Sequence, residues 1–374
     1  MRKTLAVARK EVRQAVRDPL SLLMLLGLPV FMLLLYGYTL NFDVKNVALA
    51  VQDLDRSARS RALIDSFTRS GYFDLVASLP AGTDLEAVTE RRQARAILVI
   101  PEEYSRRIAS GKTAKAQFLL DGSDANSATA ILGYALSIAA AANADLLHAR
   151  LPRAGRDSFP AIRYAPRVWY NPELRSTHFL VPGLIGFILM LTAVLSTALA
   201  LVREKEFGTM EQLRVAPLRT RQLLLGKTLP YLGISLVATL FILAAARFLF
   251  GVEIRGPVLD LFVATLIYLI GALGFGLLVS SVSHSQAMAF EVGVITSMLP
   301  SLLLSGFVFP IRTMPQPLQW VTYAVPARYY LVILRGVILK GAGLEPYASQ
   351  VGFLLVYAAA VLSVATLRLS GKEG

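Results

Sequence analysis

Long apolar runs separated by short polar segments dominate the C-terminal half of the chain, and one such run lies near the N-terminus. Six runs of about 20 residues have the length of membrane spans, and they cover residues 20–40, 179–202, 228–250, 259–280, 287–309 and 349–369. A helix rises about 1.5 Å per residue, so about 20 apolar residues cross a hydrocarbon core of roughly 30 Å. The pattern predicts a polytopic α-helical membrane protein with six transmembrane helices.

Residues 41–177, between the first two spans, show a different pattern. Short apolar runs indicate strands at residues 47–51, 73–77, 96–100 and 116–120, with a last extended piece at 162–169. Helical stretches lie between and after them, at residues 57–69, 84–92, 102–109 and 127–150. Strands that alternate with helices are typical of an α/β domain. We therefore expect one α/β domain at residues 41–177.

The first 19 residues carry six Lys or Arg residues, and Leu5, Ala8 and Val12 recur at helical spacing. This pattern predicts a basic amphipathic helix that lies on an anionic membrane surface. Alternatively, the charges only orient the span at residues 20–40. That run is longer than the core of a cleavable signal peptide, usually about 7–15 residues, so we interpret it as an uncleaved anchor.

Charge and aromatic residues set the expected topology. Lys and Arg flank the cytoplasmic ends of spans, which places both termini, and the loop at residues 203–227, in the cytoplasm. The α/β domain is then extracytoplasmic. Residues 310–346 contain several prolines together with Trp and Tyr. We expect this segment to form short helices that re-enter the outer leaflet, because Trp and Tyr prefer the interface.

Composition agrees with this architecture and excludes several function classes. The chain is 55% hydrophobic and 17% charged, whereas soluble domains carry about 25% charged residues. The net charge of +13 is explained by residues that flank spans, so nucleic-acid binding is not favoured. The sequence has no cysteine and only three histidines, which argues against disulfides, thiolate centres and a histidine metal site.

Motifs for chemistry are weak. Two Gly-Lys-Thr triplets, at residues 111–113 and 226–228, have Arg106 and Arg221 where a P-loop requires its first glycine, so the chain has no visible ATPase site. We therefore expect no catalytic residue. Glu291 lies just inside the fifth span. A carboxylate there can face a translocation pathway. Alternatively, it only caps the start of the helix, where its negative charge interacts favourably with the helix dipole.

The polar loop between the second and third spans carries the most specific motif. Residues 202–231 read VREKEFGTMEQLRVAPLRTRQLLLGKTLPY. This stretch resembles the signature loop of ABC type-2 exporter permeases, approximately R-E-[KR]-E-x-G-T-x-E-x-L-x-x-[ST]-P followed by G-K-x-x-P. Ala216 departs from that pattern. The sequences at residues 171–173 (NPE) and 306–310 (GFVFP) also resemble the family, and the whole chain is similar to its subgroup with a large extracytoplasmic domain.

The resemblance implies the permease subunit of an ATP-binding-cassette exporter, which is a transporter subunit and not an enzyme. ATP and Mg would be bound by a separate cytoplasmic P-loop ATPase, and two permeases would form a dimeric translocation pathway. Residues 204–213 would form a coupling helix. The residues expected to contact the ATPase are Glu204, Glu206, Thr209, Glu211 and Arg214. Alternatively, these side chains only stabilise the loop.

Further partners follow from the same resemblance. The second permease would be an identical copy or a paralogue, in a bacterial inner membrane, and a periplasmic adaptor with an outer-membrane channel would complete the efflux route. The cargo would be a drug, a lipid or another amphiphile, and no pattern in the spans chooses between them. The rival interpretation is a multi-span anchored extracytoplasmic receptor or sensor without transport, but six spans and such a loop exceed what an anchor requires.

Overall fold

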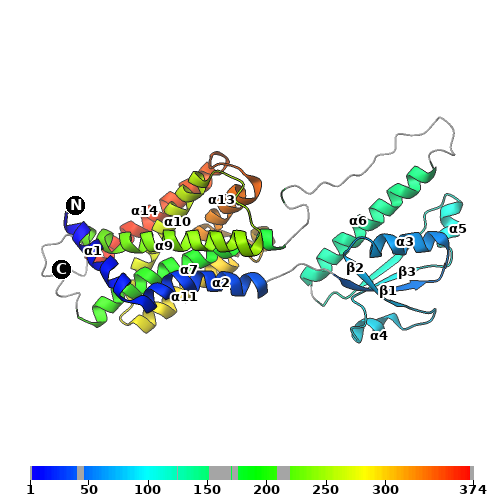
Figure 1. Cartoon of the computed structure of the whole chain (residues 1–374), viewed down its shortest axis with the longest axis horizontal. Helices are drawn as coiled ribbons and strands as arrows, with labels where there is room; N and C mark the ends of the chain where they lie inside the picture. Colours follow the sequence, from blue (N-terminus) through cyan, green and yellow to red (C-terminus); the bar gives the residue numbers. More distant parts are fainter. Residues whose placement is uncertain are drawn as a thin grey trace. The chain divides into compact units, whose positions relative to one another are not determined.

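A computed structural model describes residues 2–39, 46–123, 125–150, 170, 176–208 and 220–370. The chain divides into two compact units (Figure 1). One comprises Met1–Asn41 together with Trp169–Gly374, and the other comprises Phe42–Val168. We call the first the helical unit and the second the sheet unit. The extended piece expected at residues 162–169 lies outside the described residues.

The sheet unit contains the four strands expected from the apolar runs: β1 (Val47–Asp53), β2 (Phe73–Ser78), β3 (Ala96–Ile100) and β4 (Gln117–Leu120). Their order in the sheet is β2-β1-β3-β4. Strand β1 is parallel to both β2 and β3, and β4 is antiparallel to β3. Among the described residues of this unit, four helices accompany the sheet: α3 (Ala58–Thr68), α4 (Leu85–Glu90), α5 (Tyr104–Ala109) and α6 (Ala125–Arg150).

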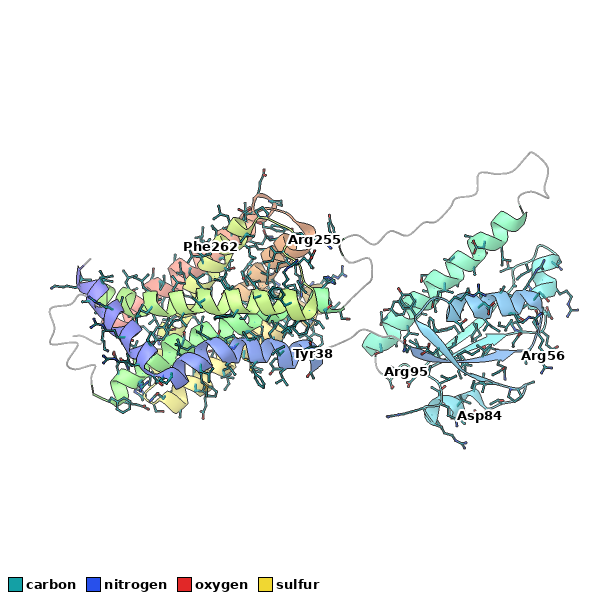
Figure 2. The ribbon with its side chains drawn as sticks, in the orientation of Figure 1. Tyr38, Arg56, Asp84, Arg95, Arg255 and Phe262 are labelled. Carbon is teal, nitrogen blue, oxygen red and sulfur yellow. The ribbon has the colours of Figure 1, made fainter. Side chains whose placement is uncertain are left out.

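The two faces of this sheet are covered unequally. Helices α3, α5 and α6 lie on one face and α4 lies on the other (Figure 1). Successive strand residues point to opposite faces, so Leu49 packs into the larger core with Phe67 and Ile131, while Ala50 packs with Val88 beneath α4. Asp84 caps α4 (Figure 2), because its carboxylate accepts hydrogen bonds from the first backbone N–H groups of that helix.

Long helices build the helical unit: α1 (Arg2–Arg17), α2 (Pro19–Thr39), α7 (Ser176–Glu206), α9 (Thr220–Phe250), α10 (Val258–Val282), α11 (Gln286–Leu303), α13 (Pro326–Lys340) and α14 (Ala348–Ser370). Short pieces lie between α11 and α14: η1 (Ile311–Thr313), α12 (Gln316–Val321), η2 (Thr322–Ala324) and η3 (Glu345–Tyr347). Apolar side chains such as Tyr38 and Phe262 are exposed on this unit (Figure 2), as expected where helices meet lipid.

Helix α7 is the centre of the helical unit. Of its most apolar stretch, 78% is buried within the protein, against 22% for α9, α11 and α14. Thr197 on α7 donates a hydrogen bond to the Leu273 carbonyl of α10 at 3.0 Å, and the Tyr268 hydroxyl of α10 donates to the Gly186 carbonyl of α7 at 2.8 Å. Movements of α7 would therefore be transmitted to several neighbours.

Among the described residues, seven helices are long and apolar enough to cross a membrane, namely α2, α6, α7, α9, α10, α11 and α14. Six of them correspond to the expected spans, and α6 is the addition. Helix α6 is long and apolar enough because it is rich in alanine, yet it packs on the sheet through Ile131, Ala135 and Ile138. The chain is a polytopic helical membrane protein, and the count of six spans stays a prediction.

Two segments of the helical unit differ in detail from the expectation. Helix α11 ends at Leu303 although the apolar run continues to Phe309, because Gly306 adopts a left-handed conformation with φ of 80° and turns the chain. In the segment 310–346, short helices form as expected. Helix α13, however, is longer than the short helices expected there, with 15 residues, and its residues Tyr330, Ile333 and Leu334 are fully buried. How deep this segment lies in a membrane stays a prediction.

Candidate functional site

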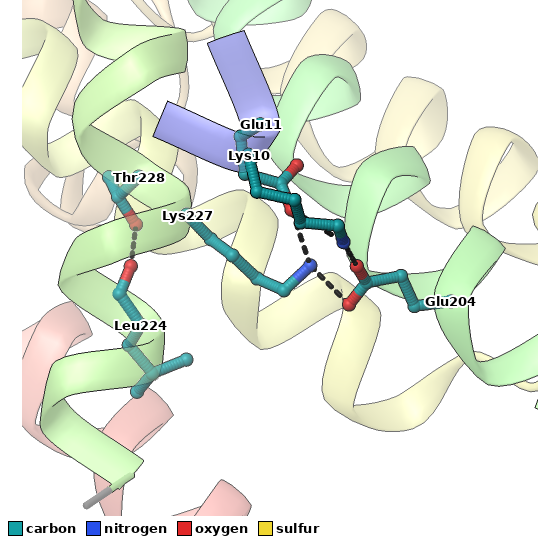
Figure 3. A network of polar contacts seen from close by, with 6 residues as sticks. All are labelled: Lys10, Glu11, Glu204, Leu224, Lys227 and Thr228. Carbon is teal, nitrogen blue, oxygen red and sulfur yellow. Dashed lines mark hydrogen bonds and ion pairs between the residues drawn. The ribbon is translucent and has the colours of Figure 1, made fainter. Parts of the chain in front are cut away.

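Both ends of the motif loop meet the N-terminal helix in the described structure (Figure 3). Glu204 lies near the end of α7, and Lys227 lies in the first turns of α9. The loop residues between these helices, 209–219, lie outside the described residues. Lys10 and Glu11 of α1 fill the space between the two helices. Side chains 194 and 216 residues apart in sequence are thus brought into direct contact.

These four charged side chains form one network, which we call the ion cluster: Lys10, Glu11, Glu204 and Lys227. The Lys10 ammonium contacts one oxygen of Glu204 at 2.5 Å and Glu11 at 3.2 Å. The Lys227 ammonium contacts the second oxygen of Glu204 and also Glu11, the latter at 3.4 Å. Two cations and two carboxylates alternate, so the cluster carries no net charge.

Three of the four side chains in the ion cluster are buried, which makes the loss of any one of them costly. The side chains of Glu11, Glu204 and Lys227 are only 5%, 7% and 3% exposed, whereas Lys10 is 46% exposed. Removing one partner from a buried pair typically costs about 3–5 kcal/mol, because the remaining charge is left without a partner in a low-dielectric site. The cluster therefore fixes the relative positions of α1, α7 and α9 strongly.

The protonation of Lys10 follows from its neighbours. Partial burial lowers the pKa of Lys10, but hydrogen bonding and Coulombic attraction from Glu204 and Glu11 outweigh that effect. The pKa of Lys10 therefore lies above its ordinary value. The Lys10 ammonium stays charged at neutral pH, so its contacts with Glu204 and Glu11 persist there.

Gly226 explains how α1 comes close enough for these contacts. A Cβ atom at this position would lie 2.7 Å from the Val7 Cβ and 2.9 Å from the Thr4 carbonyl oxygen. Carbon atoms at such distances clash, so only glycine lets the backbones of α1 and α9 approach this closely. The Gly-Lys pair of the motif thus has two roles. Gly226 allows α1 to pack closely on α9, and the Lys227 side chain contacts Glu11 of α1.

The other charged residues at the end of α7 contact three further segments. Arg203 donates to Asp18, at the junction of α1 and α2, at 3.5 Å. Lys205 donates to the carbonyls of Ser280 and Ser283, where α10 ends. Glu206 accepts hydrogen bonds from the backbone and side-chain nitrogens of Gln286, where α11 begins, at 2.7 and 2.5 Å. Four successive residues of α7 therefore hold the ends of α1, α2, α9, α10 and α11 in place.

A pocket of about 340 Å³ lies beside the ion cluster. Its polar side includes Glu11, Arg203 and Glu204, and its apolar walls include Met24, Leu25, Leu199 and Tyr231. Ligand pockets usually measure about 300–1,000 Å³ and combine apolar walls with a few polar groups. The volume and lining therefore suit a small amphiphilic molecule.

The expected site residues are distributed as follows. Glu204 and Glu206 lie two positions apart at the end of α7, with the contacts given above. Thr209, Glu211 and Arg214 lie outside the described residues. Glu291 is exposed on α11, and Ser285, rather than Glu291, caps that helix through its hydroxyl. Among the described residues, no group of three His, Asp or Glu side chains could hold a metal ion.

Lys10, Glu11 and Lys227 were not expected as site residues. One signal for Glu11 is present in the sequence, since it is the single acidic residue of α1 among several Lys and Arg residues. It also lies four residues after Val7, which is one helical turn along the same face. A lone carboxylate on the packing face of a basic helix indicates a buried partner cation.

Comparisons with known proteins cover almost the whole chain. The model of a family described as "ABC-2 family transporter protein" matches residues 20–367. The chain is 33% identical over 373 residues to "Probable multidrug ABC transporter permease YbhS" of Escherichia coli K12, covering 100% of this chain and 97% of that protein. It is 32% identical over 357 residues to "Probable multidrug ABC transporter permease YbhR" of the same organism, covering 96% and 95%. "Inner membrane transport permease YhhJ" of that organism is 25% identical over 328 residues, covering 87% and 86%.

Proposed function

Because the chain belongs to the ABC-2 family of transporter proteins, we propose that it is an exporter permease driven by ATP hydrolysis on a separate cytoplasmic subunit. A permease role is common to its relatives, and the chain is the non-catalytic membrane component. ATP and Mg are bound by the partner ATPase in this proposal. The permease converts movements of that ATPase into changes in the packing of its spans.

The ion cluster is the observation that carries this proposal. It ties both ends of the motif loop, through Glu204 and Lys227, to Lys10 and Glu11 of α1. A force that reaches Glu204 or Lys227 through the loop therefore acts on α1, α7 and α9 together. Since α7 is the most buried long helix of the helical unit, the movement reaches the centre of the packed helices.

We divide the proposed docking residues into two groups. Glu206, Thr209, Glu211 and Arg214 contact the ATPase in this proposal. Glu204 acts through the ion cluster, because its carboxylate is 7% exposed and is already contacted by two lysines. It can transmit a force from the loop without touching the partner.

A second permease, identical or a paralogue, completes the pathway in this proposal. Helix α11 exposes Glu291 among apolar residues such as Phe290 and Ile295. A carboxylate that faces lipid is costly, whereas one that faces a partner helix or an aqueous pathway is not. We therefore place α11 against the second permease, with Glu291 on the translocation pathway.

The proposed location is a bacterial inner membrane with both termini in the cytoplasm. Six spans are proposed because α6 packs on the sheet, which leaves an even number of crossings. The sheet unit is then extracytoplasmic, where it can meet a periplasmic adaptor and an outer-membrane channel. The proposed cargo is a drug, a lipid or another amphiphile, and the amphiphilic pocket beside the ion cluster is its proposed entry site.

Co-purification from native membranes in mild detergent tests the proposal. A P-loop ATPase is expected at one copy per permease, and its ATP hydrolysis should be coupled to export. Replacing Glu206 and Glu211 by alanine should uncouple hydrolysis from export while the permease still inserts in the membrane. Coupled export in that double variant would contradict the assignment of the loop. A preparation without any ATPase, in which the sheet unit binds a ligand, would favour the receptor interpretation.

A further inference from the structure

The sheet unit contains a groove that its packing leaves open. Helix α6 runs along one side of the groove, and α5 with the following residues 111–116 forms the other side. Its volume is about 660 Å³, within the roughly 300–1,000 Å³ typical of ligand sites. All of its lining residues belong to the sheet unit, so the groove is defined by one compact part of the chain.

The floor of the groove is the hydrophobic core itself. Leu63, Tyr104 and Ile108 belong to the larger core cluster of the sheet unit, and all three also line the groove. On the α6 side, Leu136 lines the groove and is 62% exposed. Apolar surface that remains open to water costs about 25 cal/mol per Å² relative to a covered surface. An apolar ligand in the groove would complete this core.

Small residues determine the shape of the open side. Ala139 and Ala140 line the groove one turn after Leu136. Their methyl groups leave room where larger side chains would close the space between α6 and α5. These small side chains keep the apolar side of the groove accessible to a hydrocarbon chain.

The rim of the groove is basic. The stretch at residues 111–116, GKTAKA, contains Lys112 and Lys115 and no acidic residue. Lys112 lines the groove directly. Arg107 is paired with Glu103 at 3.6 Å, and its side chain also donates a hydrogen bond to the Thr113 carbonyl at 2.8 Å, so it fixes the position of this stretch. An apolar channel with a basic edge is complementary to an anionic head attached to a hydrocarbon chain.

We propose that this groove binds an anionic amphiphile, with its hydrocarbon chain along Leu136 and Ala140 and its acidic head beside Lys112. The site is separate from the ion cluster and from the loop that we assign to ATPase coupling. Ligand binding in the groove can therefore be tested independently of the proposed export function. It also accounts for why α6 is apolar enough to resemble a membrane span while it packs on a sheet.

Photolabelling of the full-length protein in phosphatidylcholine nanodiscs tests the site. The probe is a palmitic acid that carries a photoreactive group and an alkyne, and the matched neutral probe is the corresponding alcohol. The acid should label peptides from residues 104–116 and 132–146. Ala140→Trp fills the channel and should reduce this labelling by about tenfold, equivalent to ~1.4 kcal/mol of binding free energy.

Ala141→Trp is the matched control, because Ala141 is exposed on α6 and does not line the groove. It should label like the native protein, and both variants should keep the native elution profile. Labelling that is equal in the two tryptophan variants, or absent from these peptides, would overturn the site. The surface variant Lys112→Glu with Lys115→Glu should weaken labelling by the acid and not by the alcohol. Equal effects on both probes would overturn the anionic head.

Discussion

At the scale of single residues, Glu204 and Glu206 illustrate how two similar side chains on one helix differ in role. Glu204 is buried between Lys10 and Lys227, whereas Glu206 is exposed and accepts hydrogen bonds from Gln286. The sequence motif treats both as charged positions of one loop. Only the packing of α1 against α9 separates a side chain that holds the fold from one that is accessible to a partner.

Glu204→Gln should therefore destabilise the protein much more than Glu206→Gln. The first change leaves buried Lys227 with one carboxylate fewer, at a cost of about 3–5 kcal/mol. The second change concerns an exposed group, whose interactions are screened by solvent, and should cost much less. Heating detergent-solubilised protein before size-exclusion chromatography measures the difference in melting temperature. Equal shifts in the two variants would mean that the cluster does not hold α1.

A second prediction at this scale concerns acid stability of the sheet unit. Asp55 accepts hydrogen bonds from the backbone and hydroxyl groups of Ser105 at 3.1 and 2.8 Å. Partial burial raises the pKa of Asp55, but hydrogen bonds from Ser57 and Ser105 outweigh it, so the pKa lies below its ordinary value of 3.8. A depressed pKa means that the stabilisation is complete above pH 3.8 and is lost as the pH falls through the folded-state pKa.

We expect hydrogen exchange of β1 and α5 to accelerate as the pH falls below about 4, after correction for the intrinsic exchange rate. Asp55→Asn should be less stable than the native protein at neutral pH, and it should lose the part of the pH dependence that Asp55 contributes. Asp84, which caps α4 on the other face of the sheet, supplies the control. Asp84→Asn should leave the exchange of α5 and its pH dependence unchanged. An identical acid profile for native protein and Asp55→Asn would remove Asp55 as the cause.

At the scale of elements, the seating of α1 on α9 depends on one position. Gly226→Ala places a methyl group against Val7 and the Thr4 carbonyl, and relieving such a clash typically costs about 1–3 kcal/mol. Gly233 lies in the same helix, and a methyl group added there would meet open space, with no neighbouring atom within 4 Å. Gly233→Ala should therefore stabilise α9 by about 0.5–1 kcal/mol through helix propensity. Thermal stability of both variants, measured in parallel, checks these opposite signs.

Some elements of the fold could be predicted from sequence patterns and others could not. The long apolar helices and the strands β1 to β4 could be predicted because hydrocarbon thickness and a buried sheet impose run lengths on consecutive residues. The end of α11 could not, because Gly306 turns the chain while apolar residues continue to Phe309. The ion cluster could not either, since no local period relates Glu11 to Lys227. Helix α6 has the composition of a span, and only its packing on Ile131 and Ile138 shows its contact with the sheet.

At the scale of the whole molecule, the number of crossings determines on which side each part lies. The chain contains no cysteine, so any introduced cysteine reports its own position. In the six-span arrangement, Lys112→Cys and Tyr170→Cys are both extracytoplasmic, and Arg214→Cys is cytoplasmic. A membrane-impermeant maleimide should label the first two in intact cells and the third only after permeabilisation.

A crossing by α6 would change this result in a defined way. Lys112 and Tyr170 lie before and after α6 in sequence, so they would then be labelled from opposite sides of the membrane. Labelling of only one of them in intact cells would exclude the six-span arrangement. Labelling of Arg214→Cys in intact cells would place the motif loop outside and would contradict its role in coupling.

The separation of the partners in the ion cluster has a consequence for biogenesis. Ribosomes add roughly 5–20 residues per second, so Lys227 is synthesised about 10–40 s after Glu11, which precedes it by 216 residues. During that interval α1 has no α9 to pack against, and its carboxylate has no buried cation to meet. The basic face of α1 can hold it at the headgroups until α9 is synthesised. The N-terminal helix is thus synthesised first and packs on α9 late. In a chain that stops before Lys227, α1 would lack this packing.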